Sequence, residues 1–136
     1  MTQYAKLLPE ELPSWQLPYW EALKEHRLIV QKCAQCATLR HIPKEICARC
    51  HSTDYQWSEL SGNGEIFTYT IVRRAPTPAY QADVPYVIAH VAMNEGVRMI
   101  ADLVGVTPDD VTIGQPVRAI YDDVTPDWTL LRFQPR

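Results

Sequence analysis

The sequence has no hydrophobic run long enough to cross a membrane, although 46% of its 136 residues are hydrophobic. A transmembrane helix needs about 20 consecutive apolar residues, and the apolar runs here are far shorter. The N-terminus also lacks the pattern of a secretory signal peptide. We therefore expect a cytoplasmic protein without membrane contact, in which cysteine thiols stay reduced.

Catalytic motifs are also missing from the sequence. Glycine is scarce, and Gly62 and Gly64 precede an expected strand rather than a helix, so they do not form a phosphate-binding loop. No Gly-x-Ser-x-Gly nucleophile elbow occurs. Asp102, Asp122 and Asp123 are candidate acids, but no sequence spacing pairs any of them with a catalytic base. We therefore expect no catalytic activity from this chain alone.

The chain has no excess of basic residues, since 16 Asp and Glu stand against 13 Lys and Arg, for a net charge of −3. Residues 24–74 are locally basic, whereas residues 75–136 are acidic. The basic part is either a solvated face or a surface for an anionic ligand or partner. Single-stranded nucleic acid is one alternative ligand, with Phe67, Tyr69 and Trp128 as base-stacking candidates. The acidic second part would repel a phosphate backbone and argues against nucleic acid.

All four cysteines fall in one stretch, as two Cys-x-x-Cys pairs separated by ten residues. Each two-residue spacer allows a tight turn that directs two sulfurs to one ion, and two such turns complete a tetrahedron of thiolates. The spacing therefore predicts a structural zinc site with the ligands Cys33, Cys36, Cys47 and Cys50. Rubredoxin-type iron and redox-active thiols are alternatives, and disulfides are disfavoured where thiols stay reduced.

The residues just after each cysteine pair are unusual for a zinc knuckle. Glycine often stands there because the backbone can need positive φ, but this sequence has Ala37 and His51. If both φ angles are positive, each costs on the order of 1 kcal/mol. His51 and His41 also place imidazoles near the site, but four cysteines already fill a zinc shell.

The N-terminal part combines an extended arm with one amphipathic helix. Prolines punctuate residues 1–17, and Pro18 suits the first turn of a helix that we expect to run to about Arg27. We expect Trp15, Tyr19 and Trp20 to form a partner interface, because so many aromatics are difficult to hide in a small domain. The alternative is that the same face packs on the core of this chain.

The remainder of the sequence predicts β-structure. Short strands are expected before and after the cysteine pairs, at residues 28–30 and 55–57, and residues 61–64 break the chain. Five more strands are expected over residues 65–73, 86–93, 97–103, 117–121 and 128–133. The first of these should alternate, with Ile66 and Thr68 on one side and Phe67 and Tyr69 on the other.

These elements predict a mainly β chain in three parts. We expect an N-terminal arm and helix over residues 1–27 and a rubredoxin-like zinc ribbon over residues 28–60. Residues 61–136 are expected to form an OB-fold, because five strands of uneven length suit a small closed barrel. No stretch is left for helices that would cover a parallel sheet.

In this order the pieces resemble a family of small acyl-CoA-associated proteins in which a rubredoxin-like zinc ribbon is joined to an OB-fold. Beside the cysteine pairs, the resemblance rests on Pro18-Tyr19-Trp20-Glu21-Ala22-Leu23, Arg27-Leu28, Pro43-Lys44, Ser61-Gly62-Asn63-Gly64-Glu65-Ile66, Pro85-Tyr86-Val87-Ile88-Ala89, Ile113-Gly114-Gln115-Pro116-Val117 and Phe133-Gln134-Pro135. It covers nearly the whole chain. Lys44 stands where the family usually has arginine, and Ala37 and His51 where it usually has glycine.

The resemblance implies a non-catalytic accessory subunit of a thiolase-type enzyme, which would be a thiolase, an acyltransferase or a retro-aldolase acting on CoA thioesters. Such a subunit stabilises a larger thiolase-like subunit in a heteromer, here expected as a heterotetramer, and helps form its CoA channel. The implied setting is lipid, aromatic or steroid catabolism. Some relatives instead assist enoyl-CoA hydratases of the hot-dog fold, which is the alternative function.

If the implied ligand is CoA or an acyl-CoA, four residues are candidates for binding it. Arg73 and Arg74 end an expected strand beside a proline-rich loop, where paired arginines can clamp phosphate through charge-assisted hydrogen bonds. Tyr80 and Tyr86 are candidates to line the path of the adenine or the pantetheine. The alternative for the two arginines is a solvated strand end.

Overall fold

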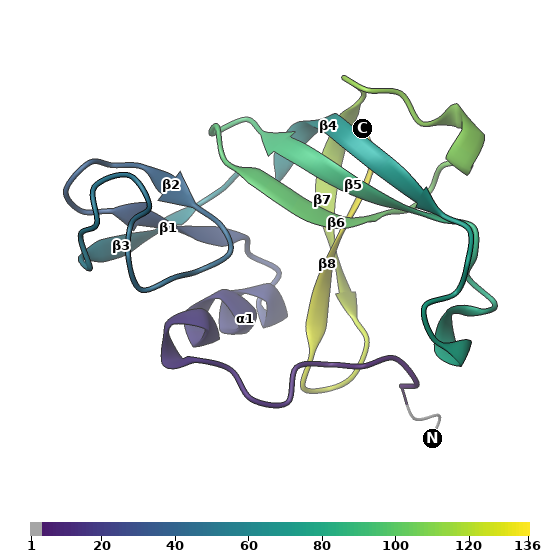
Figure 1. Cartoon of the computed structure of the whole chain (residues 1–136), viewed down its shortest axis with the longest axis horizontal. Helices are drawn as coiled ribbons and strands as arrows, with labels where there is room; N and C mark the ends of the chain where they lie inside the picture. Colours follow the sequence, from purple (N-terminus) through teal and green to yellow (C-terminus); the bar gives the residue numbers. More distant parts are fainter. Residues whose placement is uncertain (1–3) are drawn as a thin grey trace.

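The computed structural model describes residues 4–136, so the first three residues of the predicted arm lie outside it. A three-stranded sheet and a closed barrel lie side by side, with one short helix beneath the junction between them (Figure 1). This arrangement confirms the predicted mainly β fold with an N-terminal helix and a five-stranded barrel. None of the helices among residues 4–136 has the length and apolar character needed to cross a membrane.

The smaller sheet carries the cysteine pairs. Its strands are β1 (Ile29–Cys33), β2 (Leu39–Arg40) and β3 (Tyr55–Glu59), in the order β2-β1-β3 with antiparallel pairing throughout. The strands predicted at residues 28–30 and 55–57 are both present and extend further than expected. Because β1 is central, its side chains are buried on both faces except at Lys32.

The barrel has the strand connectivity of an OB-fold. Its strands are β4 (Asn63–Val72), β5 (Tyr86–Met93), β6 (Arg98–Leu103), β7 (Pro116–Asp123) and β8 (Thr129–Pro135). They close in the order β4-β5-β6-β8-β7, with β6 and β8 parallel and the other pairs antiparallel. Single 3₁₀ turns, η2 (Pro78–Tyr80) and η3 (Pro108–Asp110), interrupt two of the connections. The five predicted barrel strands are therefore confirmed.

The expected uninterrupted alternation along β4 is wrong. The pairing of β4 with β5 shifts between Ile66 and Thr68, which marks a β-bulge. A bulge inserts one unpaired residue and exchanges the two faces of the strand beyond it. Consequently Thr68 is exposed, whereas Tyr69 and Ile71 turn inward and pack against the core.

Only the first half of the Ser61-Gly62-Asn63-Gly64 stretch interrupts the β-structure. Gly62 has a φ of +87° and turns the chain, whereas Gly64 already belongs to β4. A Cβ at Gly64 would lie 2.6 Å from the Ala92 carbonyl oxygen on β5. Glycine is required there because the two strand backbones approach so closely.

The helix is shorter than predicted at its C-terminal end. After a 3₁₀ turn, η1 (Ser14–Gln16), helix α1 covers Leu17–Lys24 instead of reaching Arg27. His26 adopts a φ of +58°, and the Arg27 and His26 N–H groups donate to the carbonyls of Ala22 and Leu23. This Schellman-type ending satisfies the last helical carbonyls without glycine. The sequence has no glycine at this point that would predict the stop.

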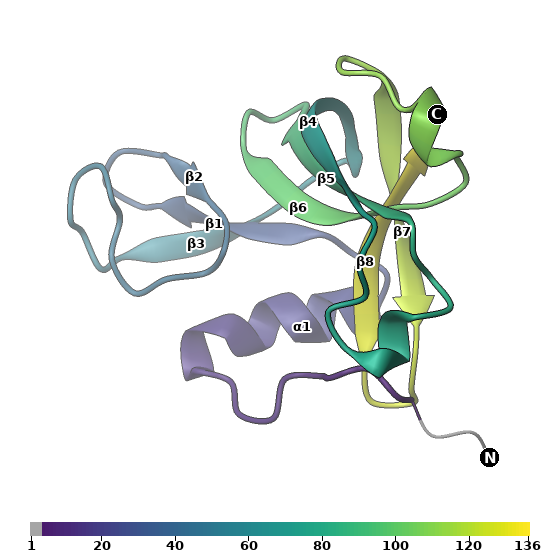
Figure 2. The ribbon, with the colours of Figure 1, turned by 45° about the vertical axis from the view of Figure 1, so that its right-hand side comes forward.

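Helix α1 joins the ribbon to the barrel in one shared core. Its buried residues are Tyr19, Ala22 and Leu23, on the face that meets β1 and β8 (Figure 2). The hydrophobic cluster contains Tyr19 and Leu23 together with ribbon residues such as Val30 and barrel residues such as Phe133. The two β-structures are therefore not independent, because the helix fills the wedge between them.

A polar contact fixes the end of α1 to the barrel. His26 Nε2 lies 3.1 Å from a carboxylate oxygen of Asp123 on β7, and its ring stacks on Tyr121 at a centroid distance of 5.2 Å. Thr129 Oγ1 donates to the same Asp123 carboxylate at 2.5 Å. The hydrogen bonds with Thr129 and then His26 lower the pKa of Asp123.

We predict that Asp123→Asn lowers stability in a pH-dependent way. A lowered folded-state pKa means that the carboxylate stabilises the fold above its unfolded value of about 3.9 and loses this contribution as pH falls. The variant should therefore be less stable than wild type at pH 6, and the difference should shrink below pH 4 in urea titrations. Asp127→Asn, at an exposed residue of the same hairpin, is the control and should give no pH-dependent difference.

Candidate metal centre and barrel cavity

The two Cys-x-x-Cys pairs form matching turns. In the first, the Cys33 N–H donates to the Thr38 carbonyl and the Ala37 N–H to the Cys33 carbonyl, at 2.9 and 3.0 Å. In the second, the Cys47 N–H donates to the Ser52 carbonyl and the His51 N–H donates to the Cys47 carbonyl. Both loops therefore present their sulfurs from the same backbone geometry, as the identical spacing predicts.

The four sulfurs converge on one point. All of them lie within 4.8 Å of one another, and the pairs Cys33–Cys50 and Cys36–Cys47 are separated by 3.5 and 3.6 Å. Tetrahedral zinc with Zn–S bonds of about 2.3 Å needs sulfurs about 3.8 Å apart. These separations exceed a disulfide bond of about 2.05 Å, so the cysteines are free thiols. The donor set fits a structural zinc.

The residues around the cysteines distinguish the thiol ligands from the two nearby histidines. Contacts with Thr38, whose hydroxyl lies 3.1 Å from Cys36 Sγ, lower the pKa of the Cys36 thiol to about 6, whereas the neighbouring thiols, Cys33 first, raise the pKa of Cys50. His41 is not among the cluster residues; burial lowers its pKa to about 4, and its ring packs against Tyr19. His51 is exposed beside the cluster and does not belong to it.

A buried polar contact braces the loop between the cysteine pairs. The Gln31 side chain is fully buried on β1, and its Oε1 accepts from Arg40 Nε and from the Lys44 backbone N–H, both at 2.7 Å. Arg40 Nη2 also donates to the Lys44 carbonyl. Lys44 therefore acts here through its backbone, which explains why lysine can replace the arginine usual in the resembling family.

The positive φ angles considered from the sequence are present, at +62° for Ala37 and +65° for His51. We predict that Ala37→Gly stabilises the protein by about 0.5–1 kcal/mol, because glycine enters this conformation without steric strain. Ala34→Gly in the same loop, where φ is not positive, should instead destabilise slightly. Thermal unfolding of both zinc-loaded variants tests this, and equal effects would contradict it.

The three aromatic residues predicted to form a partner interface are separated by the fold. Tyr19 is 7% exposed inside the shared core. Trp20 is half-buried and stacks edge-on against Tyr19 and against Trp128 of the barrel hairpin, with centroid distances of 5.4 and 5.3 Å. Trp15 lies on η1, outside the core cluster. Tyr19 and most of Trp20 are thus buried where the ribbon meets the barrel, which we call the seam. Trp15 lies outside this seam.

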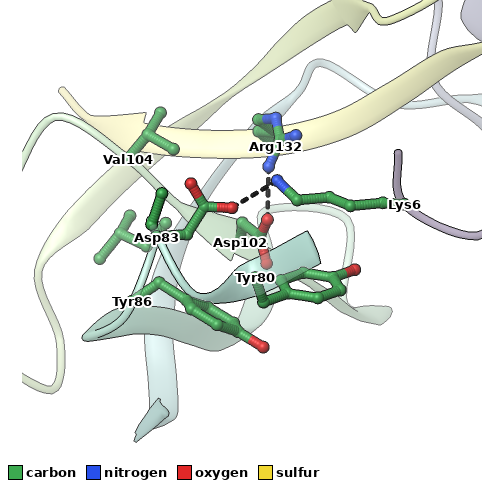
Figure 3. Close-up of a pocket in the computed structure, with 9 residues that line it drawn as sticks. Lys6, Tyr80, Asp83, Tyr86, Asp102, Val104 and Arg132 are labelled. Carbon is green, nitrogen blue, oxygen red and sulfur yellow. Dashed lines mark hydrogen bonds and ion pairs between the residues drawn. The ribbon is translucent and has the colours of Figure 1, made fainter. Parts of the chain in front are cut away.

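A cavity of about 440 Å³ lies on the barrel beside the η2 loop (Figure 3). Its lining residues are Lys6, Tyr80, Ala82, Asp83, Tyr86, Asp102, Leu103, Val104 and Arg132. The rings of Tyr80 and Tyr86 stack at 5.6 Å, and Lys6 Nζ lies 5.0 Å from the Tyr80 ring. The two tyrosines chosen from the sequence therefore share one site.

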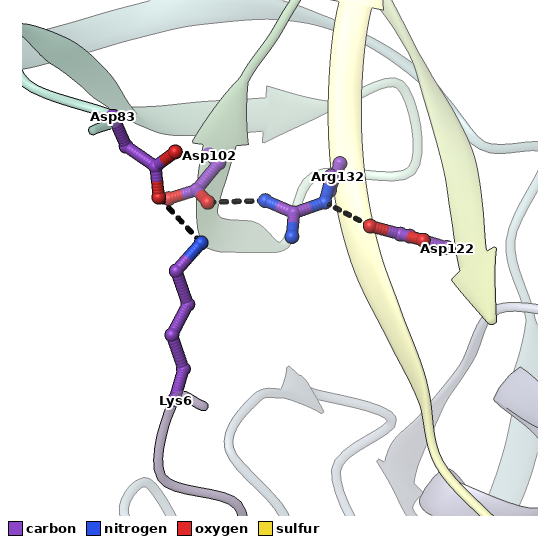
Figure 4. A network of polar contacts seen from close by, with 5 residues as sticks. All are labelled: Lys6, Asp83, Asp102, Asp122 and Arg132. Atoms are coloured by element: carbon purple, nitrogen blue, oxygen red, sulfur yellow. Dashed lines mark hydrogen bonds and ion pairs between the residues drawn. The ribbon is translucent and has the colours of Figure 1, made fainter. Parts of the chain in front are cut away.

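The charges of this cavity are paired with one another (Figure 4). Lys6 on the N-terminal arm contacts Asp83 at 2.5 Å, and this hydrogen bond raises the pKa of Lys6. Arg132 on β8 contacts Asp102 on β6, and its Nε donates to Asp122 on β7 at 2.8 Å. The network includes two cations and three carboxylates, so it offers no excess positive charge to a phosphate.

The two arginines chosen from the sequence do not line this cavity. Arg73 Nη2 lies 3.8 Å from Asp109 of η3, and both side chains are largely exposed; Arg74 is exposed as well. The cavity cations are instead Lys6 and Arg132. No local pattern predicts either residue, because the fold brings them together from opposite ends of the chain.

The base-stacking candidates are also dispersed. Tyr69 packs against the barrel core, Trp128 packs on Trp20, and Phe67 is exposed on the outer face of β4. The Phe67 ring is covered by the Arg98 guanidinium at 3.9 Å and meets the His90 ring edge-on at 5.7 Å. The three rings therefore do not form one stacking surface, which weakens the nucleic-acid alternative.

Comparison with known proteins supports both parts of the chain. Residues 20–56 match the family described as the ChsH2 rubredoxin-like zinc ribbon domain, and residues 57–122 match the ChsH2 C-terminal OB-fold domain. A DUF35 domain-containing scaffold protein of Methanocaldococcus jannaschii is 36% identical over 110 residues, which cover 79% of this chain and 77% of that protein.

Two longer relatives carry enzyme names. A probable enoyl-CoA hydratase alpha subunit of Thermomonospora curvata is 40% identical over 117 residues. A 3-oxo-4,17-pregnadiene-20-carboxyl-CoA hydratase alpha subunit of Mycobacterium tuberculosis is 38% identical over the same length. Each match covers 86% of this chain but only 36% of the relative. The chain thus spans about a third of the length of these two relatives.

Solved structures give the same family. A chain of the structure described as Ltp2-ChsH2(DUF35) aldolase superposes with a TM-score of 0.83 at 37% identity, over 93% of this chain and 98% of that one. A DUF35 protein of unknown function from Sulfolobus solfataricus, 17% identical with a TM-score of 0.61, shares the fold. This chain therefore belongs to the DUF35 family, with the zinc ribbon and OB-fold of the ChsH2 type.

Proposed function

We propose that this chain is an accessory subunit of an enzyme complex that acts on CoA thioesters, and that its partner is a larger subunit of the thiolase type. The observation that carries this is the likeness to the DUF35 chain of an aldolase structure, which this chain covers over 98% of its length. The names of the hydratase alpha subunits point to the same substrate class. A heterotetramer of two subunits of each kind is the assembly we expect.

The polar groups of the described residues support an accessory role. Arg132 is paired with both Asp102 and Asp122, and Lys6 is held by Asp83. A general acid or base must instead be able to exchange its proton with a substrate. The cysteines form the metal cluster and the four-thiolate shell leaves no open position for a substrate. We therefore assign the chemistry to the partner and a contact surface to this subunit.

The cavity beside the stacked tyrosines is the part of this surface that we assign to CoA. Its paired charges suit the amide groups and the carbon chain of pantetheine better than a phosphate, which needs unpaired cations. Tyr80 and Tyr86 supply flat apolar walls, and the carboxylates accept hydrogen bonds from amide N–H groups. Arg73 and Arg74 are exposed at the end of β4 and remain the candidates for the phosphates.

We predict that Tyr86→Ala raises the KM of the assembled enzyme for its acyl-CoA substrate about 5- to 20-fold and changes kcat little. Loss of an apolar contact made equally in the ground and transition states has this signature. Steady-state kinetics on the heteromer measures it. Ile113→Ala, at an exposed residue before β7, is the control. Equal KM values for both variants would contradict the assignment of CoA to this cavity.

Reconstitution tests the proposed function. The chain is co-expressed with a candidate thiolase-type protein, and the two should elute as one complex that turns over acyl-CoA. The larger protein alone should lose most of its activity, and this chain alone should have none. Steady turnover by the isolated chain, or a partner that works equally well without it, would contradict the proposal.

An enoyl-CoA hydratase complex is the second candidate, because two relatives are named as hydratase alpha subunits. The matched segment is 36% of each relative, so most of each relative lies outside the similarity. The same co-expression with a hot-dog-fold hydratase separates the candidates. Stable assembly with the hydratase and increased enoyl-CoA hydration would favour this second function over the first.

A further inference from the structure

The loop between the cysteine pairs exposes two large aliphatic side chains. Ile42 is 56% exposed and Ile46 is 51% exposed. Their backbone is held firmly, because Pro43 is buried between them, Cys47 follows directly, and Gln31 binds the Lys44 N–H. A braced loop that holds apolar side chains in solvent is a typical feature of a protein contact surface.

A groove of about 420 Å³ borders one of these isoleucines. Its lining residues come from three segments and are Ser14, Trp15, Glu45, Ile46, Thr53 and Tyr55. The Tyr55 ring has two neighbours, the Trp57 ring on the same strand at 5.7 Å and the Arg40 guanidinium of β2 at 5.1 Å. Trp15, from the N-terminal 3₁₀ turn, and Tyr55 thus provide aromatic walls, and aromatic residues are enriched where partners bind tightly.

We infer that this ribbon groove, formed by η1, the metal loop and the start of β3, receives an apolar side chain of the larger partner subunit, next to a lysine or arginine of that subunit. The inference rests on the proposed function and names its contact surface. The basic neighbour follows from Glu45, the charged residue among those that line the groove. A carboxylate beside apolar walls favours a cation on the incoming segment and steers its approach.

The outer barrel face is the strongest competing surface, since it exposes Phe67 and Ile100. There, however, the Phe67 ring is already covered by Arg98 and flanked by His90 within this chain. Ile100 pairs with His90 across regular strands. The ribbon groove instead offers a concave space with aromatic walls, which a single anchoring side chain can fill.

The test compares Ile46→Asp with Ile100→Asp as a matched control, since both side chains are exposed. Each variant of the full zinc-loaded chain is titrated against the thiolase-type protein that co-elutes with wild type in the reconstitution, and the dissociation constant is measured by calorimetry. We expect Ile46→Asp to weaken binding at least about 30-fold, the effect of losing an interface hot spot. Ile100→Asp should bind like wild type, and both variants should keep wild-type Tm and metal content.

The charge is tested separately. Glu45→Gln should weaken binding several-fold, and Glu45→Lys should weaken it further because the attraction becomes a repulsion. Added salt should then weaken binding of the Glu45→Lys variant less than it weakens binding of wild type. Wild-type affinity for Ile46→Asp, or loss of affinity for Ile100→Asp alone, would overturn the ribbon groove and leave the proposed function intact. A wild-type chain that forms a dimer through Ile46 would also overturn it. Failure of wild type to bind the larger protein would overturn both proposals.

Discussion

Cys47→Ser protein should contain less than a tenth of the zinc of wild type, should aggregate readily and should have no cooperative unfolding of its ribbon. Cys47 is 1% exposed and contributes one of four converging sulfurs. A structural zinc contributes on the order of 10 kcal/mol to folding, which exceeds the stability of most small domains. Elemental analysis of wild type should give one zinc per chain, and a red iron-loaded protein would indicate the rubredoxin alternative.

The control is His51→Ala, which removes an imidazole next to Cys50 and outside the cluster. It should keep its zinc, and loss of zinc would show that the coordination shell includes this histidine. A chelator should unfold the ribbon before the barrel, and the change should reach Trp20 fluorescence because α1 shares the core of both. Wild-type protein that is metal-free and still fully folded would contradict a structural zinc.

The sequence predicted those features that depend on local spacing. The two cysteine turns follow from a two-residue spacer, and the left-handed backbone at Ala37 and His51 follows from the same turn. Valine and isoleucine content and the Asn-Glu-Gly turn that follows located the strand Tyr86–Met93, whose side chains alternate between half-buried and buried along its whole length. Such local patterns constrain the backbone before any tertiary contact forms.

Features that depend on distant contacts could not be predicted. The bulge after Ile66 arises from the register between β4 and β5, so the faces of Thr68 and Tyr69 were assigned to the wrong sides. The charge network depends on Lys6 of the N-terminal arm reaching Asp83 in the middle of the chain. A single sequence contains no periodicity that indicates such pairs. For the same reason the sequence favoured Arg73 and Arg74, at the exposed end of β4, over the cations that line the cavity.

The helix shows how the same residues permitted two interpretations. Aromatic content alone does not tell a core from an interface, because both bury large side chains. The structure separates them by position, since Tyr19 and Trp20 face the seam and Trp15 faces the ribbon groove. One short segment can therefore serve both the core and an exposed groove, with the buried residues holding the ribbon against the barrel.

Trp20→Ala should lower the stability of the isolated chain by about 2–4 kcal/mol, which is slightly less than for a fully buried tryptophan. Trp20 is half-buried, and its ring meets Tyr19 and Trp128 edge-on. The change removes the apolar contact between α1 and the β7–β8 hairpin, together with two aromatic pairs worth about 1 kcal/mol each. In thermal unfolding we expect a decrease in Tm of about 10 °C.

Two further variants identify the contact responsible. Leu17→Ala, at a 43% exposed residue of the same helix, should change stability by less than about 0.5 kcal/mol. Trp128→Ala combined with Trp20→Ala should destabilise less than the sum of the single variants, because the second substitution acts on a pair that is already broken. If Trp20→Ala instead melts like wild type and only the heteromer weakens, the Trp20 side chain serves the partner, and the wedge between ribbon and barrel is held by Tyr19 and Leu23 alone.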